Sequence, residues 1–173
     1  MTSILKVDEV QHTNGTSALT IDSSGRILTP ARPAFRARYS TSTTVGAQGN
    51  IVFNEEDFDI GNNYNTSNGR FTAPVAGIYF FSFTALAAGN TSGGVLADST
   101  AMEVRFDKNG SEGSWSTRHY VYLVGATSYI TVNKTDCIQL AVNDYIHVDV
   151  LNNYVYSSVD THYDTVFQGF LLG

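Results

Sequence analysis

The chain has 173 residues, of which 42% are hydrophobic and only 15% are charged, and its formal net charge is −6. The composition favours strands and turns over helices, because the chain has only three Lys and five Glu but ten Tyr and ten Phe. So many aromatic residues also exclude a largely disordered chain. The acidic balance also argues against a nucleic-acid partner, because a domain that neutralises phosphates needs clustered Lys and Arg.

The first 30 residues contain three short strand candidates separated by turn signals, at residues 4–10, 18–21 and 26–28. Each has few large apolar side chains, so we expect these strands to gain stability by pairing between chains or by docking on the rest of the protein. Two of the three prolines, Pro30 and Pro33, follow at once and favour a boundary. We therefore predict an N-terminal leader of residues 1–30 and a head of residues 31–173.

The head is predicted to consist of strand after strand, because no segment shows helical periodicity over three turns. The expected strands are residues 34–40, 50–54, 70–73, 78–85, 101–107, 119–124, 129–133, 138–142, 145–151 and 166–173. Residues 55–68 are predicted to form an acidic, Asn-rich loop, and Asn109-Gly110 to turn a hairpin. About ten short strands with regular turn signals predict an all-β, ten-stranded jelly-roll sandwich.

Three strand patterns bear on function. The expected strand 78–85 is apolar on both faces, which is typical of the middle of a sandwich or of an interface. His147 and Asp149 share one face of the strand 145–151 and could bind a metal or form an acid–base pair, but the outward side of an exposed sheet explains both equally well. Cys137 is the only cysteine, and its alternating setting predicts a strand position and no disulfide.

Two motifs in the head are specific. A Gly-x-Phe-x-x-Pro-x-x-Gly-x-Tyr-x-Phe run occupies residues 69–81, and Phe-x-Gly-Phe-Leu-Leu occupies residues 167–172. With these motifs, residues 34–173 resemble the globular head of complement component C1q and its tumour-necrosis-factor-like relatives. The residues that carry the resemblance are Phe35, Gly69, Phe71, Pro74, Gly77, Tyr79, Phe81, Asn109, Gly110, Asp144, Phe167, Gly169 and Phe170. Asn143 stands where the family usually has glycine, and Asn tolerates the left-handed conformation.

The resemblance implies a homotrimer, because members of this family assemble around a three-fold axis. Residues 10–28, with turns at Asn14-Gly15 and Ser24-Gly25, are similar to the amino-terminal leader of bacteriophage tail-fibre and virion-appendage proteins. Together the resemblances imply a virion structural protein, made in the host cytoplasm, whose residues 1–30 attach to other virion proteins and whose head binds a host-surface glycan or protein. The alternative is a capsid-decorating or cement protein. The N-terminal residues lack a basic head and a long apolar run, so we expect no signal peptide and no membrane span.

No nucleophile elbow, phosphate loop, dinucleotide fingerprint or paired-Cys zinc spacing occurs, so we expect a protein that is not an enzyme and has no cofactor. A hydrolytic depolymerase is disfavoured because no paired carboxylates mark a groove. The candidate receptor-binding residues are Tyr154, Tyr156, His162 and Tyr163, since aromatic side chains among Asn, Ser and Asp are typical of recognition surfaces.

Two charged clusters complete the candidates. The acidic residues Glu55, Glu56, Asp57 and Asp59 offer oxygen ligands suited to calcium, although a solvated turn explains them as well. The basic residues Arg26, Arg32, Arg36 and Arg38 gather near the expected boundary between leader and head. We predict that they form a solvated face at this junction, with a specific anion contact as the alternative.

Overall fold

The structure is a computed structural model that describes residues 4–38, 43–44, 49–88, 101–110, 118–122, 129–151, 158–159 and 165–173. Its strands are β1 (Glu9–Gln11), β2 (Ser17–Ile21), β3 (Ile27–Leu28), β4 (Ala34–Arg38), β5 (Thr43–Thr44), β6 (Gly49–Ile51), β7 (Glu55–Ile60), β8 (Tyr64–Asn65), β9 (Arg70–Thr72), β10 (Gly77–Ala88), β11 (Ala101–Lys108), β12 (His119–Tyr122), β13 (Tyr129–Leu140), β14 (Tyr145–Leu151), β15 (Ser158–Val159) and β16 (Val166–Leu171). The described residues contain no helix, as the composition predicts. Over this part of the chain, accordingly, no helix has the length and apolarity needed to cross a membrane.

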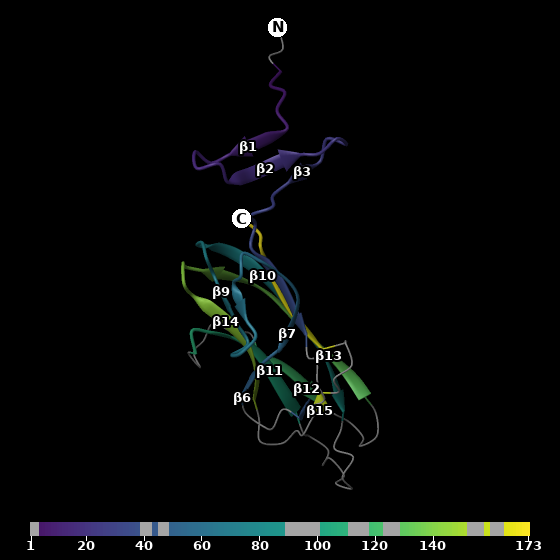
Figure 1. The fold of residues 1–173 in the computed structure, drawn as a ribbon. Coiled ribbons are helices and arrows are strands. Elements are labelled where there is room, and N and C mark those ends of the chain that lie inside the picture. The colour runs from purple at the N-terminus through teal and green to yellow at the C-terminus, as the bar shows by residue number, and fades with distance from the viewer. Residues whose placement is uncertain are drawn as a thin grey trace.

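The strands form three sheets. The leader sheet has the order β1-β2-β3 and lies at one end of the molecule, near the C-terminus (Figure 1). A seven-stranded sheet, here called the β10 sheet, has the order β5-β15-β10-β16-β4-β7, with β13 also paired to β10. A six-stranded sheet, the β14 sheet, has the order β12-β11-β14-β9-β8, with β6 also paired to β14. The two large sheets pack face to face and form the head.

Aromatic side chains from both large sheets fill the space between them. Phe35 of β4 stacks on Tyr64 of β8 and on Phe71 of β9, with ring centroids 4.9 and 4.8 Å apart. Phe81 of β10 lies 6.0 Å from Phe106 of β11, and all five rings are buried. Such rings bury large apolar areas, so this cluster holds the sandwich together.

The fold confirms an all-β sandwich and corrects the expected elements in three ways. The described head has thirteen strands, β4 to β16, so a count of ten is not confirmed. The expected loop 55–68 is wrong, because residues 55–60 form β7, which pairs antiparallel with β4. The expected strands 129–133 and 138–142 are one continuous strand, β13, whose polar middle stays in the ladder because it pairs along all of β10. The boundary at residue 30 stays a prediction.

The left-handed conformations expected at Asn109-Gly110 and Asn143 are present, but Asn109-Gly110 does not close a tight hairpin, because the pairing of β11 with β12 ends at Val104, opposite His119. Asn109 and Gly110 after β11 have φ values of 59° and 68°, both in the left-handed region that an Asn-Gly turn adopts. Asn143 has φ 69°, so it does adopt the left-handed conformation. The two turns are linked, because the Asn109 side-chain amide donates a hydrogen bond of 2.7 Å to Asp144. The motif residues at these positions therefore hold the framework of the head.

Candidate functional site

The acidic residues of β7 pair with the arginines of β4. Arg36 Nε lies 2.9 Å from Asp57 Oδ2, and Arg38 Nε lies 2.7 Å from Asp57 Oδ1. Arg38 also forms an ion pair with Glu55. Two of the four arginines expected at the junction therefore neutralise part of the acidic cluster within the head. Sequence reasoning found both sets of residues but missed that they pair.

The remaining acidic residues of this cluster differ in environment. Asp59 Oδ2 accepts a hydrogen bond of 2.8 Å from the backbone N–H of Tyr64, whereas Glu56 is exposed. The calcium hypothesis for Glu55, Glu56, Asp57 and Asp59 stays a prediction. Three of its four carboxylates already bind groups of the protein, and a calcium ion would compete with them.

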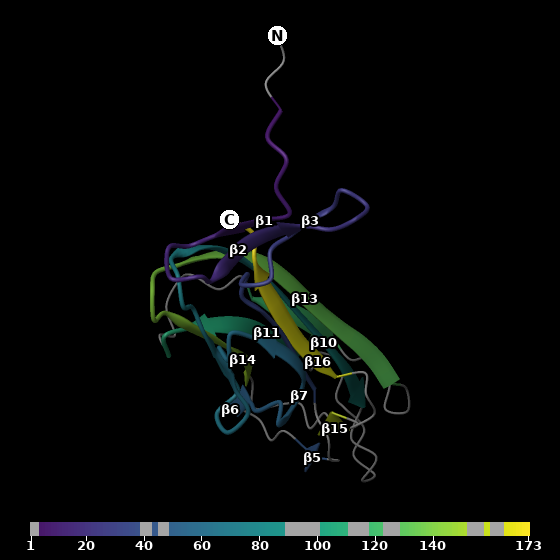
Figure 2. The same cartoon turned by 45° about the horizontal axis from the view of Figure 1, so that its top comes forward.

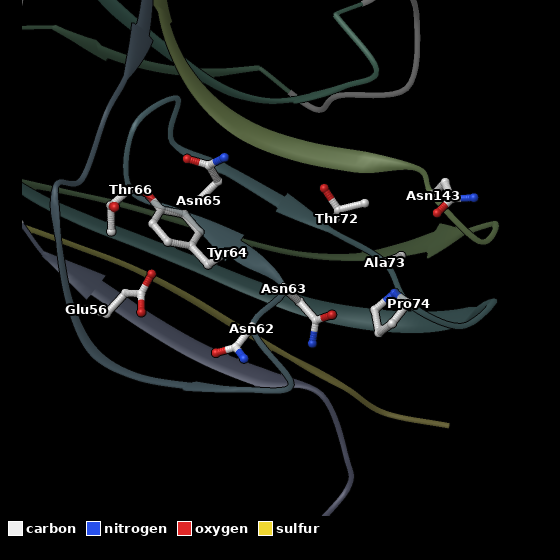
Figure 3. A pocket seen from close by; sticks show the side chains of 10 residues that line it. All are labelled: Glu56, Asn62, Asn63, Tyr64, Asn65, Thr66, Thr72, Ala73, Pro74 and Asn143. Carbon is white, nitrogen blue, oxygen red and sulfur yellow. The ribbon is translucent and has the colours of Figure 1, made fainter.

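A polar pocket of about 510 Å³ lies beside β7 and β8 (Figure 3). Its lining residues are Glu56, Asn62, Asn63, Tyr64, Asn65, Thr66, Thr72, Ala73, Pro74 and Asn143. Amide and hydroxyl groups both donate and accept hydrogen bonds, which suits a ligand rich in hydroxyl groups. Tyr64 itself is buried, and its hydroxyl donates to the Phe53 carbonyl oxygen at 3.0 Å. Sequence reasoning missed this pocket, and the signal that could have found it is the cluster of Asn62, Asn63 and Asn65.

A second cluster of charged residues lies on β11 and β14. His147 Nε2 is 3.0 Å from Asp149 Oδ1, and Arg105 donates to Asp149 Oδ2 at 3.1 Å. Burial alone raises the pKa of Asp149, but the hydrogen bonds from His147 and Arg105 outweigh burial and hold it below the usual value. Burial raises the pKa of Asp107, which faces His147 across the two strands.

These side chains correct the expectation of an exposed sheet face. Arg105, Asp107, His147 and Asp149 are all buried, although they lie on the side of the β14 sheet that faces away from the aromatic core. The alternation of residues 145–151 predicted which side chains share a face. It could not predict that the polar face would be covered.

The outer face of the β10 sheet carries a row of apolar residues, here called the apolar row. Cross-strand pairing places side by side Ile60 of β7, Ala34 of β4, Phe170 of β16, Phe80 of β10 and Cys137 of β13. The Phe80 and Phe170 rings lie 5.3 Å apart, and Phe170 is 42% exposed. Cys137 is exposed and lies in a strand, as predicted. Contiguous exposed apolar surface of this kind marks an interaction site.

The candidate receptor-binding residues Tyr154, Tyr156, His162 and Tyr163 lie outside the described residues. Arg26 and Arg32 are placed: Arg26 pairs with Asp22 within the leader, and Arg32 donates a hydrogen bond to the Leu172 carbonyl oxygen. Arg32 therefore ties the start of the head to the C-terminal end of the chain.

Comparison with known proteins gives a family and a fold. The sequence profile of the C1q domain matches residues 34–172. The globular domain of zebrafish complement 1qA protein is 19% identical, with a TM-score of 0.63 over 82% of this chain and 98% of that chain. Eiger TNF from S. frugiperda is 9% identical, with a TM-score of 0.60 over 83% and 94% of the two chains. Murine APRIL at pH 8.5 is 11% identical, with a TM-score of 0.55 over 82% and 99%. The comparison with curated proteins found no match.

Proposed function

This chain belongs to the C1q domain family, and we propose that it is a non-enzymatic, homotrimeric structural protein of a bacteriophage virion that binds a host-surface receptor. In this proposal the head forms the tip of a tail fibre or of a similar appendage. The fold is C1q-like and TNF-like, and proteins of this kind are trimeric. The observation that carries the proposal is the apolar row on the β10 sheet, because a lone chain would leave it in water.

The apolar row has the position and chemistry of a contact between copies. It crosses five strands, β7, β4, β16, β10 and β13. Phe170 lies three residues from the C-terminus, and the C-terminus lies beside the leader strands (Figure 2). Ile78, next to the row on β10, is 47% exposed. Fully burying an exposed Phe or Ile contributes about 1.5–3 kcal/mol, so Phe170 and Ile78, each a little under half exposed, would contribute roughly 1 kcal/mol each. Such side chains from all three copies would together favour association.

The leader would join the head to its neighbours. Its sheet is short, and Ile27 and Leu28 of β3 are exposed. A pocket of about 430 Å³ lies between leader and head, lined by Ala18 and Thr29 on one side and by Ile60, Val75 and Leu171 on the other. This arrangement supports a leader that docks on the head and still presents apolar side chains to other virion proteins or to the other two chains.

The receptor would be a glycan or a protein on the host surface. The polar pocket beside β7 and β8 supports a glycan, because its amide and hydroxyl groups can pair with sugar hydroxyls. Three copies of a weak site on one trimer act together, since binding at one site raises the effective concentration at the others. Tyr154, Tyr156, His162 and Tyr163 remain candidates for the same role.

The oligomeric state tests the proposal first. Light scattering after size exclusion should give three times the 18.8 kDa mass of the chain. Phe170→Asp places a charge in the apolar row and should give a monomer. Val142→Asp is the matched control, because Val142 is also exposed but lies in the turn between β13 and β14, and it should leave the trimer intact. A wild-type monomer would overturn the trimer.

The location and the ligand need separate experiments. Immuno-gold labelling of particles distinguishes a tail appendage from the alternative, a capsid-decorating protein on the shell. Labelled trimer should bind intact host cells, and replacing Tyr154 and Tyr156 should reduce binding. Unchanged binding by that variant would move the receptor site to another surface. A fall in the viscosity of host polysaccharide would instead indicate a depolymerase.

A further inference from the structure

The buried charged cluster of the β14 sheet contains three side chains that can each offer one metal-ligand atom. Asp107 lies on β11, and His147 and Asp149 lie on β14, with Asp107 directly opposite His147 in the strand register. The three ligand atoms lie within 4.8 Å of one another. Asp107 is 3% exposed and His147 is 6% exposed. The cluster is therefore closed to bulk water and formed by two adjacent strands.

Two atoms of this cluster have no hydrogen-bond partner among the described residues. They are Asp107 Oδ1 and His147 Nδ1, and both are buried. A buried polar atom without a partner costs about 1–3 kcal/mol, so native proteins pair such atoms with protein, water or an ion. Both orphaned atoms belong to neighbouring side chains of the same cluster. One bound group could satisfy both.

The charge of the cluster favours a cation. The carboxylates of Asp107 and Asp149 both lie beside one permanently charged group, the Arg105 guanidinium. The Arg105 guanidinium lies 3.1 Å from Asp149 Oδ2 and only 3.5 Å from Asp107 Oδ2, so it holds Asp149 more closely. The backbone N–H of Gly110 also donates to the Asp107 carboxylate. Asp107 Oδ1 still has no hydrogen-bond partner among the described residues, and a buried negative charge is costly unless it is paired.

We propose that Asp107, His147 and Asp149 bind one divalent transition-metal ion, of which Zn²⁺ is the best fit, in each chain. Zinc takes imidazole nitrogen and carboxylate oxygen at about 2.0–2.2 Å. The ligand atoms of Asp107, His147 and Asp149 lie within 4.8 Å of one another, so they would need to move only slightly inward around one ion. Calcium fits less well, because it takes six to eight oxygen ligands.

The ion would be a structural cross-link. It joins β11 to β14 on the face of the β14 sheet opposite the aromatic core. Its ligands lie on different strands from the acidic residues of β7, so this site is separate from the calcium hypothesis at Glu55, Glu56, Asp57 and Asp59. The proposal does not depend on the trimer or on a virion role.

Calorimetric titration of chelator-treated full-length protein with ZnCl₂ tests the site. We expect one Zn²⁺ per chain and a rise in Tm of about 5–10 °C at a hundredfold excess over Kd. Calcium should give a much smaller rise. Co²⁺ added to the wild-type protein should give visible absorption typical of a site with few ligands, which tests the site without any substitution.

His147→Gln removes the nitrogen ligand and should weaken Zn²⁺ binding by at least about tenfold. The matched control is His119→Gln, because His119 is an exposed histidine on the neighbouring strand β12, and this variant should bind zinc as the wild type does. Asp107→Asn is a second variant with nearly unchanged shape, in case His147→Gln does not fold. The proposal is overturned if millimolar Zn²⁺ leaves the Tm unchanged, if Ca²⁺ binds equally well, or if His147→Gln binds as the wild type does.

Discussion

A side chain at Gly169 of β16 should destabilise the protein, and Gly169→Ala tests whether the aromatic core is as tightly packed as the structure indicates. A Cβ atom at this position would lie 2.6 Å from Phe81 Cδ1 and 2.9 Å from the Phe80 carbonyl oxygen. Phe81 cannot retreat, because its ring packs against Phe71, Phe106 and Phe167. The substitution must therefore shift β16 or push Phe81 off its rotamer.

Overpacking of this kind lowers the free energy of unfolding by about 1–3 kcal/mol. Replacing glycine raises it by about 0.4–1 kcal/mol, because alanine reduces the conformational entropy of the unfolded chain. Because the Phe80 carbonyl oxygen is backbone and cannot move aside as a side chain can, the cost of overpacking should lie near its upper end, with a net loss of about 2 kcal/mol and a fall in Tm of about 4–8 °C. Differential scanning calorimetry at one protein concentration measures it, because the Tm of an oligomer depends on concentration. Gly173→Ala is the control, since a Cβ there would meet nothing within 4 Å. A Gly169→Ala variant that melts like the control would refute the packing argument.

Three further predictions address the core, acid stability and the surface. Phe35→Ala should lower the free energy of unfolding by about 3–5 kcal/mol in denaturant titration, because it removes the ring that stacks on Tyr64 and Phe71; a loss below about 1 kcal/mol would contradict this. Hydrogen bonds from Lys108, Asn109 and the Ala141 N–H lower the pKa of Asp144 to about 2. The lowered pKa contributes about 1–2 kcal/mol to the free energy of unfolding, after allowance for the position of Asp144 near the surface. The contribution is complete above a pH of about 4, the pKa of Asp in the unfolded chain, and it is lost as the pH falls through about 2. Asp144→Asn should thus destabilise the protein at pH 7 but hardly at pH 2, and an equal effect at both pH values would refute the assignment. Arg38→Met should lower the free energy of unfolding by only about 1 kcal/mol, because the ion pairs of Arg38 are partly exposed. A double-mutant cycle with Asp57→Asn should give a coupling energy between Arg38 and Asp57 of similar size.

Most of the strands could be predicted because their signals are local. The alternation in 145–151 and the left-handed conformation at Asn109-Gly110 depend on neighbouring residues, and both predictions agree with the structure. The prediction failed at 55–60, where four acidic residues read as a solvated loop. These residues form a strand because Arg36 and Arg38, about twenty positions earlier in the chain, lie alongside and neutralise two of them.

The candidate sites were predicted less well than the fold. His147 and Asp149 were recognised as a pair on one strand face, but Asp107 was not joined to them, because it comes forty residues earlier. The polar pocket draws Glu56, Asn62–Thr66, Thr72–Pro74 and Asn143 from four separate parts of the fold. No spacing rule connects such residues before the strand order is known.

The sequence by itself determined an all-β sandwich and the left-handed conformations at Asn109 and Asn143, since composition, two-residue periodicity and turn chemistry act within a few residues. Only the tertiary structure decided which charges meet and which faces are covered. Alternation assigns a side chain to one face of a strand, but burial of that face depends on the segments that pack over it. In the folded chain His147 and Asp149 are buried in a charged cluster, and the pairing of β4 with β7 brings Arg36 and Arg38 against the acidic residues of β7.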